Sequence, residues 1–175
     1  ERLGRLTLAE TVSIIAQACK ALGRAHDQGI VHRDVKPANL FLMDVDGELF
    51  VKVLDFGIAK YRRAADLGMT ETGAMMGTPY FMSPEQIIDA KEIDQRCDLW
   101  ALGVVAYCCL VGDVPFHGQS VGALSIAIHQ GAFASVRQSR PDLPEAMDAW
   151  FARALATLPE RRFQSARELA AALWS

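Results

Sequence analysis

The sequence has no long hydrophobic run and no block of like charge. Its longest apolar stretch covers residues 99–112, about 14 residues, whereas a helix that spans a membrane requires about 20. This stretch predicts a buried core helix and no membrane segment. The N-terminus lacks an apolar run after its basic residues, so no signal peptide is expected. A net charge of -3 gives no basic footprint, so nucleic acids and anionic membranes are not expected as partners.

Paired or metal-binding cysteines are also lacking. The four cysteines form no C-x-x-C, and no His lies at zinc-ligand spacing from them, which argues against a zinc site. Three lie in apolar helical sequence, where a free Cys behaves as a small buried hydrophobe. This usage indicates a reduced, cytoplasmic compartment. The four are Cys19, Cys97, Cys108 and Cys109.

What is present is the composition of one globular domain. Apolar residues make up 51% and charged residues 22% of 175 residues, which is enough to bury a core and excludes disorder. We find no internal repeat, low-complexity tract or interdomain linker.

The first element predicted is a helix over residues 8–28. Thr7 and Glu10 have the T-x-x-E spacing of a capping box, and apolar residues follow at helical spacing. Gly29 ends the helix as a left-handed cap residue would. His26 is interpreted as a helix-end residue without a chemical role.

A β-hairpin is predicted next, because residues 40–43 and 50–54 are short apolar runs around an Asp-Gly turn at residues 44–48. The acids there lack the twelfth-position ligand of a calcium loop. The hairpin brings Asn39 and Asp55 to the same end, and one amide with one carboxylate suits Mg²⁺.

Helices are predicted over the rest of the chain. Asp98 opens the apolar helix and is interpreted as its N-terminal cap. Further helices are expected over residues 120–130 and 145–158, and Ser165-x-x-Glu168 is a second capping box. His117 and His129 have no acid or Cys at ligand spacing and are expected on the surface.

The chemistry is concentrated in residues 30–39, which read I-V-H-R-D-V-K-P-A-N. This loop places Asp34, Lys36 and Asn39 within six residues. A carboxylate, an ammonium and an amide this close can hold a hydroxyl nucleophile, a phosphate and a metal ion. The sequence D-F-G follows at residues 55–57, and G-T-P-Y-F-M-S-P-E at residues 77–85.

This ordered set resembles the catalytic half of a protein kinase, and specifically the bacterial Ser/Thr kinases of eukaryotic type. The resemblance implies a mainly α-helical fold with small β-hairpins, the C-terminal lobe of a kinase, over residues 1–175. It implies a catalytic loop at 30–39, an activation segment at 55–85 and a helical subdomain at 86–175. No G-x-G-x-x-G and no V-A-I-K strand is present, so the β-rich N-terminal lobe is not represented.

The resemblance also implies roles in transfer of phosphate from ATP to Ser or Thr of protein substrates. Asp34 would accept or orient the substrate hydroxyl proton, and Lys36 would stabilise charge on the phosphate. Asn39 and Asp55 would hold Mg²⁺, and Phe41 would lie under the adenine.

Residues around the activation segment are implied to control activity. Thr70 and Thr72 are candidate autophosphorylation sites, because Arg33 before the catalytic Asp can pair with a phosphothreonine. Thr78 is implied to hydrogen-bond Asp34 and Lys36 in the peptide site. Lys36 itself favours Ser/Thr over Tyr specificity.

Other positions have implied structural roles. Asp98 would be buried and bonded to the backbone of the His32–Arg33 segment, a role compatible with a cap. Glu85 would form a buried ion pair with Arg162, for which Arg161 is the competing partner. Phe56 and Gly57 complete the D-F-G motif.

Two other functions remain as alternatives. One is a non-catalytic pseudokinase or scaffold, and the other is a small-molecule phosphotransferase such as an aminoglycoside or choline kinase, which lacks the segment 77–85. Without the N-terminal lobe, we expect the isolated chain to be inactive and to expose an apolar surface. A homodimer is expected to serve activation, as in many relatives.

Overall fold

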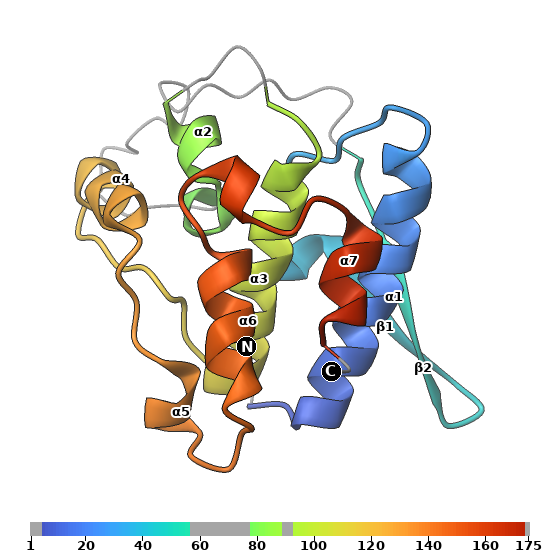
Figure 1. Cartoon of the computed structure of the whole chain (residues 1–175). Coiled ribbons are helices and arrows are strands. Elements are labelled where there is room, and N and C mark those ends of the chain that lie inside the picture. Colours follow the sequence, from blue (N-terminus) through green and yellow to red (C-terminus); the bar gives the residue numbers. More distant parts are fainter. Residues whose placement is uncertain (1–4, 57–77, 89–92, 174–175) are drawn as a thin grey trace.

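The protein is described here from a computed structural model that covers residues 5–56, 78–88 and 93–173. Helices pack around one central helix, α3, and a two-stranded sheet lies beside them (Figure 1). The α-helices are α1 (Leu8–His26), α2 (Pro84–Ile87), α3 (Arg96–Val111), α4 (Val121–Gln130), α5 (Val136–Ser139), α6 (Ala146–Ala154) and α7 (Ala166–Ala171). Short 3-10 helices are η1 (Pro37–Asn39), η3 (Thr78–Phe81) and η4 (Pro159–Arg161). The expected mainly helical fold with a small hairpin is confirmed.

Helix α3 forms the middle of the core. It is apolar on all sides, as a helix surrounded by protein must be, and nearly all of its residues are buried. It packs against α1, α5 and α6, and Trp100 stacks on Phe116 with ring centroids 5.5 Å apart. The run at 99–112 is therefore a core helix, as predicted. Within the described ranges, no helix has the length and apolar character needed to cross a membrane.

The carbonyls at the C-terminus of α3 are satisfied by its own cap residue and by groups from two other segments. The last carbonyls of a helix have no partner within it, and here the carbonyls of residues 108–111 all accept hydrogen bonds. The donors are the backbone of Gly112 at 2.8 Å and of Leu6 at 2.8 Å, and the side chains of Arg140 at 3.2 Å and Arg5 at 3.0 Å. These bonds fasten the segment before α1 to the core.

The capping box of α1 is confirmed. The Thr7 N–H donates to Glu10 Oε2 at 2.8 Å, and the Glu10 N–H donates to Thr7 Oγ1 at 3.2 Å. The helix ends at His26, two residues earlier than predicted, because the chain turns over residues 27–29. Gly29 closes that turn with φ 73°, a left-handed conformation that favours glycine.

The hairpin joins β1 (Leu40–Val45) to β2 (Glu48–Val53) in antiparallel register, with Leu40 opposite Val53. Its loop is shorter than predicted, because only Asp46 and Gly47 remain between the strands. Both have positive φ, 55° and 83°, as a two-residue turn that follows the strand twist requires.

Two predictions near the C-terminus need correction. Helix α6 ends at Ala154, short of residue 158. The second capping box is only half formed: the Glu168 N–H donates to Ser165 Oγ at 3.1 Å, but Glu168 Oε2 accepts from the backbone of Gln164 at 2.7 Å. The carboxylate instead binds the residue before the cap.

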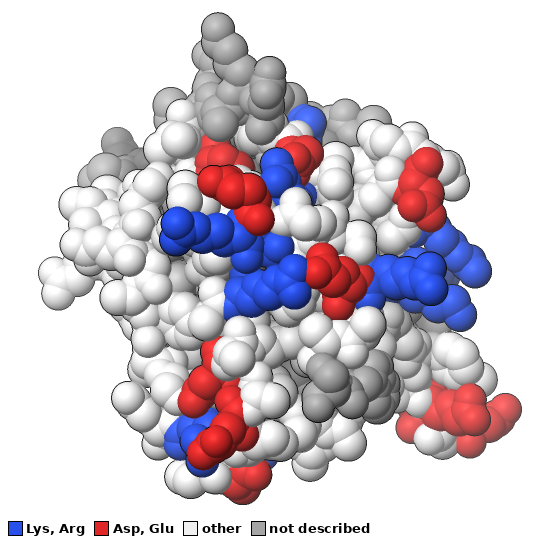
Figure 2. All heavy atoms as spheres, in the orientation of Figure 1, with Lys and Arg blue, Asp and Glu red and all other residues white. Residues whose placement is uncertain are grey.

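On the face shown in Figure 2, basic and acidic side chains are interspersed. His117 and His129 are exposed, as predicted. Arg153 and Glu168 form one ion pair between α6 and α7.

Burial of three thiols and partial burial of Cys109 predict that the folded protein resists alkylation. Desolvation raises the pKa of Cys19 and Cys108 to about 12, that of Cys109 to about 11, and that of Cys97 well above its usual value. At pH 8 a pKa near 11 leaves roughly one thiol in 10³ as the reactive thiolate. We expect iodoacetamide to label none of the four at pH 8 and all four in urea, as counted by mass spectrometry; rapid labelling without urea would contradict this burial.

The same pKa shifts determine whether the stability of the protein rises or falls at alkaline pH. Burial favours the neutral thiol, so the folded pKa lies above the unfolded value of about 8.5. The stability contributed by neutral thiols is complete below that pH and decreases as pH rises toward the folded pKa of about 12.

Candidate active site

The loop between α1 and β1 carries the candidate catalytic residues, and its backbone is strained at the residue before Asp34. Arg33 has φ 65°, which costs a non-glycine residue roughly 1–2 kcal/mol. Asp98 from the first turn of α3 holds this backbone: its Oδ1 accepts from the Arg33 N–H at 2.7 Å and its Oδ2 from the His32 N–H at 2.9 Å.

Asp98 does not cap α3. The helix starts at Arg96 after Gln95, and the carboxylate is directed away from the helix end, toward the loop. The cap interpretation is therefore wrong, and the contact implied by the family resemblance is present. Asp98 is 1% exposed, so its charge depends on these donors.

His26 supplies a further donor, which the sequence interpretation missed. Its Nε2 lies 2.8 Å from Asp98 Oδ2, and its side chain is 8% exposed. An Nε2–H that donates to the carboxylate satisfies this contact. The assignment of no role to His26 is corrected: it belongs to the group that holds the loop. The one indication that the sequence offered for this role was that the Asp98 carboxylate, if buried, needs hydrogen-bond donors.

Replacing His26 by Leu is expected to destabilise the protein by about 1–3 kcal/mol, because Asp98 Oδ2 loses a hydrogen bond in a buried site. His26→Gln is the control, since a Gln amide can supply the donor, and the Nδ1 that it removes has no partner within the described part of the chain. Urea unfolding measures both. Equal stability of the Leu variant and the wild type would contradict this role.

Asp34, Lys36 and Asn39 form one hydrogen-bonded group. Lys36 Nζ lies 3.1 and 2.8 Å from the two carboxylate oxygens of Asp34. Asn39 Nδ2 donates to the Asp34 carbonyl at 2.7 Å and to its Oδ2 at 3.2 Å. The Asp34 side chain stays 27% exposed. The structure thus presents a carboxylate that is paired with an ammonium and still open to a ligand.

Asp55 lies at the same end of the hairpin as Asn39. The Leu54 N–H donates to the Asn39 carbonyl at 2.9 Å, which joins the two chain segments directly before Asp55. Asp55 is exposed and has φ 51°, a strained conformation that is typical of functional sites.

His32 links the catalytic loop to this second segment. Its Nδ1 accepts from the Asp34 N–H at 3.2 Å, and its Nε2 lies 2.8 Å from the Leu54 carbonyl. A neutral imidazole with its proton on Nε2 satisfies both contacts. The His32 ring also packs against Phe56, with centroids 4.8 Å apart.

The hairpin itself is held on α1 by Gln17. Its Nε2 donates to the Leu49 carbonyl at 2.8 Å, and its Oε1 accepts from the Val51 N–H at 3.0 Å. A side-chain amide therefore pairs with β2 as a neighbouring strand would. This contact, which has no sequence motif, sets the position of the strand that leads to Asp55.

Asn39 and Asp55 suit a magnesium ion in their donor chemistry. Both protons of the Asn39 amide are directed at Asp34, which leaves Oδ1 as the atom that can ligate. Mg²⁺ is commonly bound by one or two protein oxygens together with substrate phosphates. No group of three or more His, Cys, Asp or Glu that could hold a metal occurs within the residues described.

Phe41 on β1 is 53% exposed and part of an apolar hairpin surface. The exposed large hydrophobic side chains of the hairpin are Phe41, Leu42, Val45 and Phe50. Such a surface is suited to contact with another apolar partner.

Glu85 is paired with Arg162 and not with Arg161. Arg162 Nη1 donates to Glu85 Oε1 at 2.7 Å and Nη2 to Oε2 at 2.8 Å, and its side chain is 0% exposed. Its guanidinium lies 4.9 Å from the Trp100 ring centroid. Arg161 is exposed, so the alternative that the sequence left open is decided.

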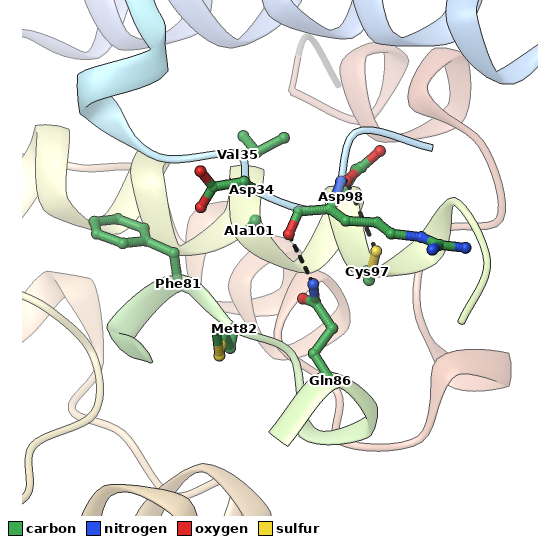
Figure 3. A pocket seen from close by; sticks show the side chains of 9 residues that line it. Asp34, Val35, Phe81, Met82, Gln86, Cys97, Asp98 and Ala101 are labelled. Carbon is green, nitrogen blue, oxygen red and sulfur yellow. Dashed lines mark hydrogen bonds between the residues drawn. The ribbon is translucent and has the colours of Figure 1, made fainter. Parts of the chain in front are cut away.

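A small pocket lies beside the candidate catalytic loop (Figure 3), where segments far apart in the sequence meet. Gln86 reaches into it and donates from Nε2 to the Arg33 carbonyl at 2.9 Å. The lining residues are Arg33, Asp34, Val35, Phe81, Met82, Gln86, Cys97, Asp98 and Ala101.

A family model described as "Protein kinase domain" matches residues 1–174. The chain belongs to the protein kinase family. Serine/threonine-protein kinase Pkn1 of Myxococcus xanthus is 42% identical over 161 residues, which cover 91% of this chain and 23% of that protein. Serine/threonine-protein kinase PknB of Mycolicibacterium smegmatis is 40% identical over 173 residues, covering 97% and 27%. The resemblance to bacterial Ser/Thr kinases is thereby confirmed.

Solved kinase structures show the same fold. The kinase domain of Mycobacterium tuberculosis PknI superposes with a TM-score of 0.69 at 30% identity, over 97% of this chain and 56% of that one. Rad53 1–466 in complex with AMP-PNP gives a TM-score of 0.76 at 26% identity, over 98% and 41%. This chain thus spans about a quarter of the curated relatives and about half of the solved kinase chains.

Several predicted kinase residues lie outside the described part of the chain. These are Gly57 and the candidate phosphorylation sites Thr70 and Thr72, together with the side chain of Thr78 at the start of η3. Their proposed roles remain predictions.

Proposed function

We propose that this chain forms the catalytic half of a protein kinase that transfers the γ-phosphate of ATP to Ser or Thr hydroxyls of proteins. The observation that carries the proposal is the group formed by Asp34, Lys36 and Asn39, joined through the Leu54–Asn39 bond to Asp55. The similarity to proteins named Ser/Thr-protein kinases supports it.

In this mechanism the carboxylate of Asp34 orients the substrate hydroxyl and takes up its proton. The hydroxyl oxygen forms a bond to the γ-phosphorus while the bond from that phosphorus to the bridging oxygen of ATP breaks, and ADP leaves. Lys36, which lies 2.8 Å from Asp34, can stabilise charge on the transferred group.

Mg²⁺ would be held by Asn39 and Asp55 and would neutralise charge on the ATP phosphates. Phe41 offers an exposed aromatic face for the adenine. The glycine-rich loop and strand lysine that kinases use for the phosphates do not occur in these 175 residues. We therefore propose that residues 1–175 alone do not suffice for transfer.

The test is phosphate transfer by the full-length gene product. We expect label from γ-labelled ATP to appear on a generic basic protein and on the kinase itself, as phosphoserine or phosphothreonine, with Mg²⁺ and not with EDTA. Self-labelling at Thr70 or Thr72, mapped by mass spectrometry, would support the activation-segment prediction.

The same measurement separates the alternatives. Binding of ATP without any transfer would favour a scaffold, and transfer to an aminoglycoside or choline instead of protein would favour a small-molecule phosphotransferase. The four cysteines, none of which forms a disulfide, are in keeping with the proposed cytoplasmic setting of the domain. Activation by dimerisation remains a prediction that the oligomeric state in solution would test.

A further inference from the structure

The peptide group that joins Arg33 to Asp34 is held at both of its polar atoms. Its N–H, on Asp34, donates to His32 Nδ1 at 3.2 Å, and its carbonyl, on Arg33, accepts from Gln86 Nε2 at 2.9 Å. Figure 3 shows Gln86 reaching up from the start of α2 to this carbonyl. The peptide directly before the proposed catalytic carboxylate is thus held by His32 within its own loop and by Gln86 from outside the loop.

The orientation of the Gln86 amide is itself determined. Its Oε1 accepts from the backbone N–H of Ser83 at 3.1 Å and from the Ser83 hydroxyl at 3.2 Å. Ser83 is fully buried. Two donors on one side require the oxygen there, so the amide nitrogen must face the Arg33 carbonyl.

We propose that Gln86 is a positioning residue for Asp34, an inference that rests on the proposed kinase function. Arg33 holds a left-handed backbone conformation with φ 65°, and rotation of the Arg33–Asp34 peptide would change ψ of Arg33 and φ of Asp34, and with them the direction of the Asp34 side chain. Asp98 restrains the peptide that precedes Arg33, and Gln86 restrains the one that follows. Through Ser83 and Gln86, the segment that starts α2 therefore sets the direction in which Asp34 leaves the backbone.

Gln86→Glu in the full-length gene product tests this directly, since it keeps the acceptor for Ser83 and places an oxygen against the Arg33 carbonyl. We expect kcat for a Ser/Thr peptide to fall about 10- to 100-fold, because small misplacement of a catalytic group is costly. The KM for ATP should stay within about twofold, because the side-chain hydrogen bonds of Gln86 run to Ser83 and Arg33 and not to the proposed ATP ligands.

Gln28→Glu is the matched control, with the same charge change at an exposed position in the turn after α1, and its kcat should equal that of the wild type. Gln86→Met removes all three side-chain hydrogen bonds of Gln86 without adding a charge and should also lower kcat. The thermal midpoint Tm distinguishes positioning from loss of fold: the inference requires a fall in kcat in a variant that still unfolds cooperatively near the wild-type Tm.

Wild-type kcat in either folded Gln86 variant would overturn the inference. If neither variant folds, Gln86 is a folding determinant and the positioning role is rejected. If the wild type transfers no phosphate, the proposed function fails, and amide hydrogen exchange still decides the contact: the Asp34 N–H should exchange faster in Gln86→Met than in the wild type, and equal exchange would refute the coupling.

Discussion

Replacing Asp34 by Asn is expected to lower phosphate transfer to a Ser/Thr peptide by about 10²- to 10⁴-fold, the usual contribution of a general base. The variant preserves the shape of the side chain but removes its ability to take up a proton. It also turns an amide N–H₂ toward Lys36 or Asn39, which both donate to the carboxylate in the native protein. Steady-state kinetics of the full-length gene product measure the loss in kcat.

Asp46→Asn is the control for this loss. Asp46 is an exposed acid in the hairpin turn with φ 55°, a conformation that Asn tolerates well, so kcat should not change. A value of kcat for Asp34→Asn close to that of the wild type would remove Asp34 from the mechanism and favour the scaffold alternative.

Replacing Arg162 by Met is expected to lower the free energy of unfolding by about 3–5 kcal/mol, because it leaves the Glu85 carboxylate without its buried partner. The side chains of Arg162 and Glu85 are 0% and 13% exposed, so water can do little to replace the lost partner of Glu85. Arg162 also donates to the carbonyls of Ala156 at 2.7 Å and Thr157 at 2.9 Å, which would lose their donors. Urea unfolding with linear extrapolation measures the change.

The neighbouring variant Arg161→Met is the matched control, since Arg161 is exposed, and it should change stability by no more than about 0.5 kcal/mol. Because the two charges act as a pair, Glu85→Gln combined with Arg162→Met should cost less than the sum of the single changes. Full additivity would show that the pair is not coupled.

The local elements could be predicted because their signals lie within one turn or one short loop. Thr7 and Glu10 are three positions apart, as a capping box requires, and the Asp-Gly pair marks the hairpin. The boundaries were less certain, since α1 ends two residues early and the hairpin turn is shorter than predicted. Chain direction at such ends depends on packing that the local pattern does not contain.

The residues of the candidate site likewise fall into those that the sequence identified and those that it missed. Asp34, Lys36 and Asn39 are close in sequence, and the motif around them identified the group. His26, Gln17 and Gln86 were missed as contributors, because each acts on a segment that is distant along the chain. Gln86 belongs to the capping box Ser83-x-x-Gln86, but that spacing gives no sign of its contact with Arg33.

By itself, the sequence determined the family, the helical class of the fold and the identity of the candidate catalytic group, because periodicity and motif spacing are local properties. The tertiary structure confirmed the implied contact of Asp98 with the loop and decided that Asp98 does not cap α3 and that Arg162, not Arg161, pairs with Glu85. It alone showed that Gln86 contacts the peptide before Asp34. The physical reason is that buried charges and carbonyls must find partners, and which partner is within reach depends on how helices pack.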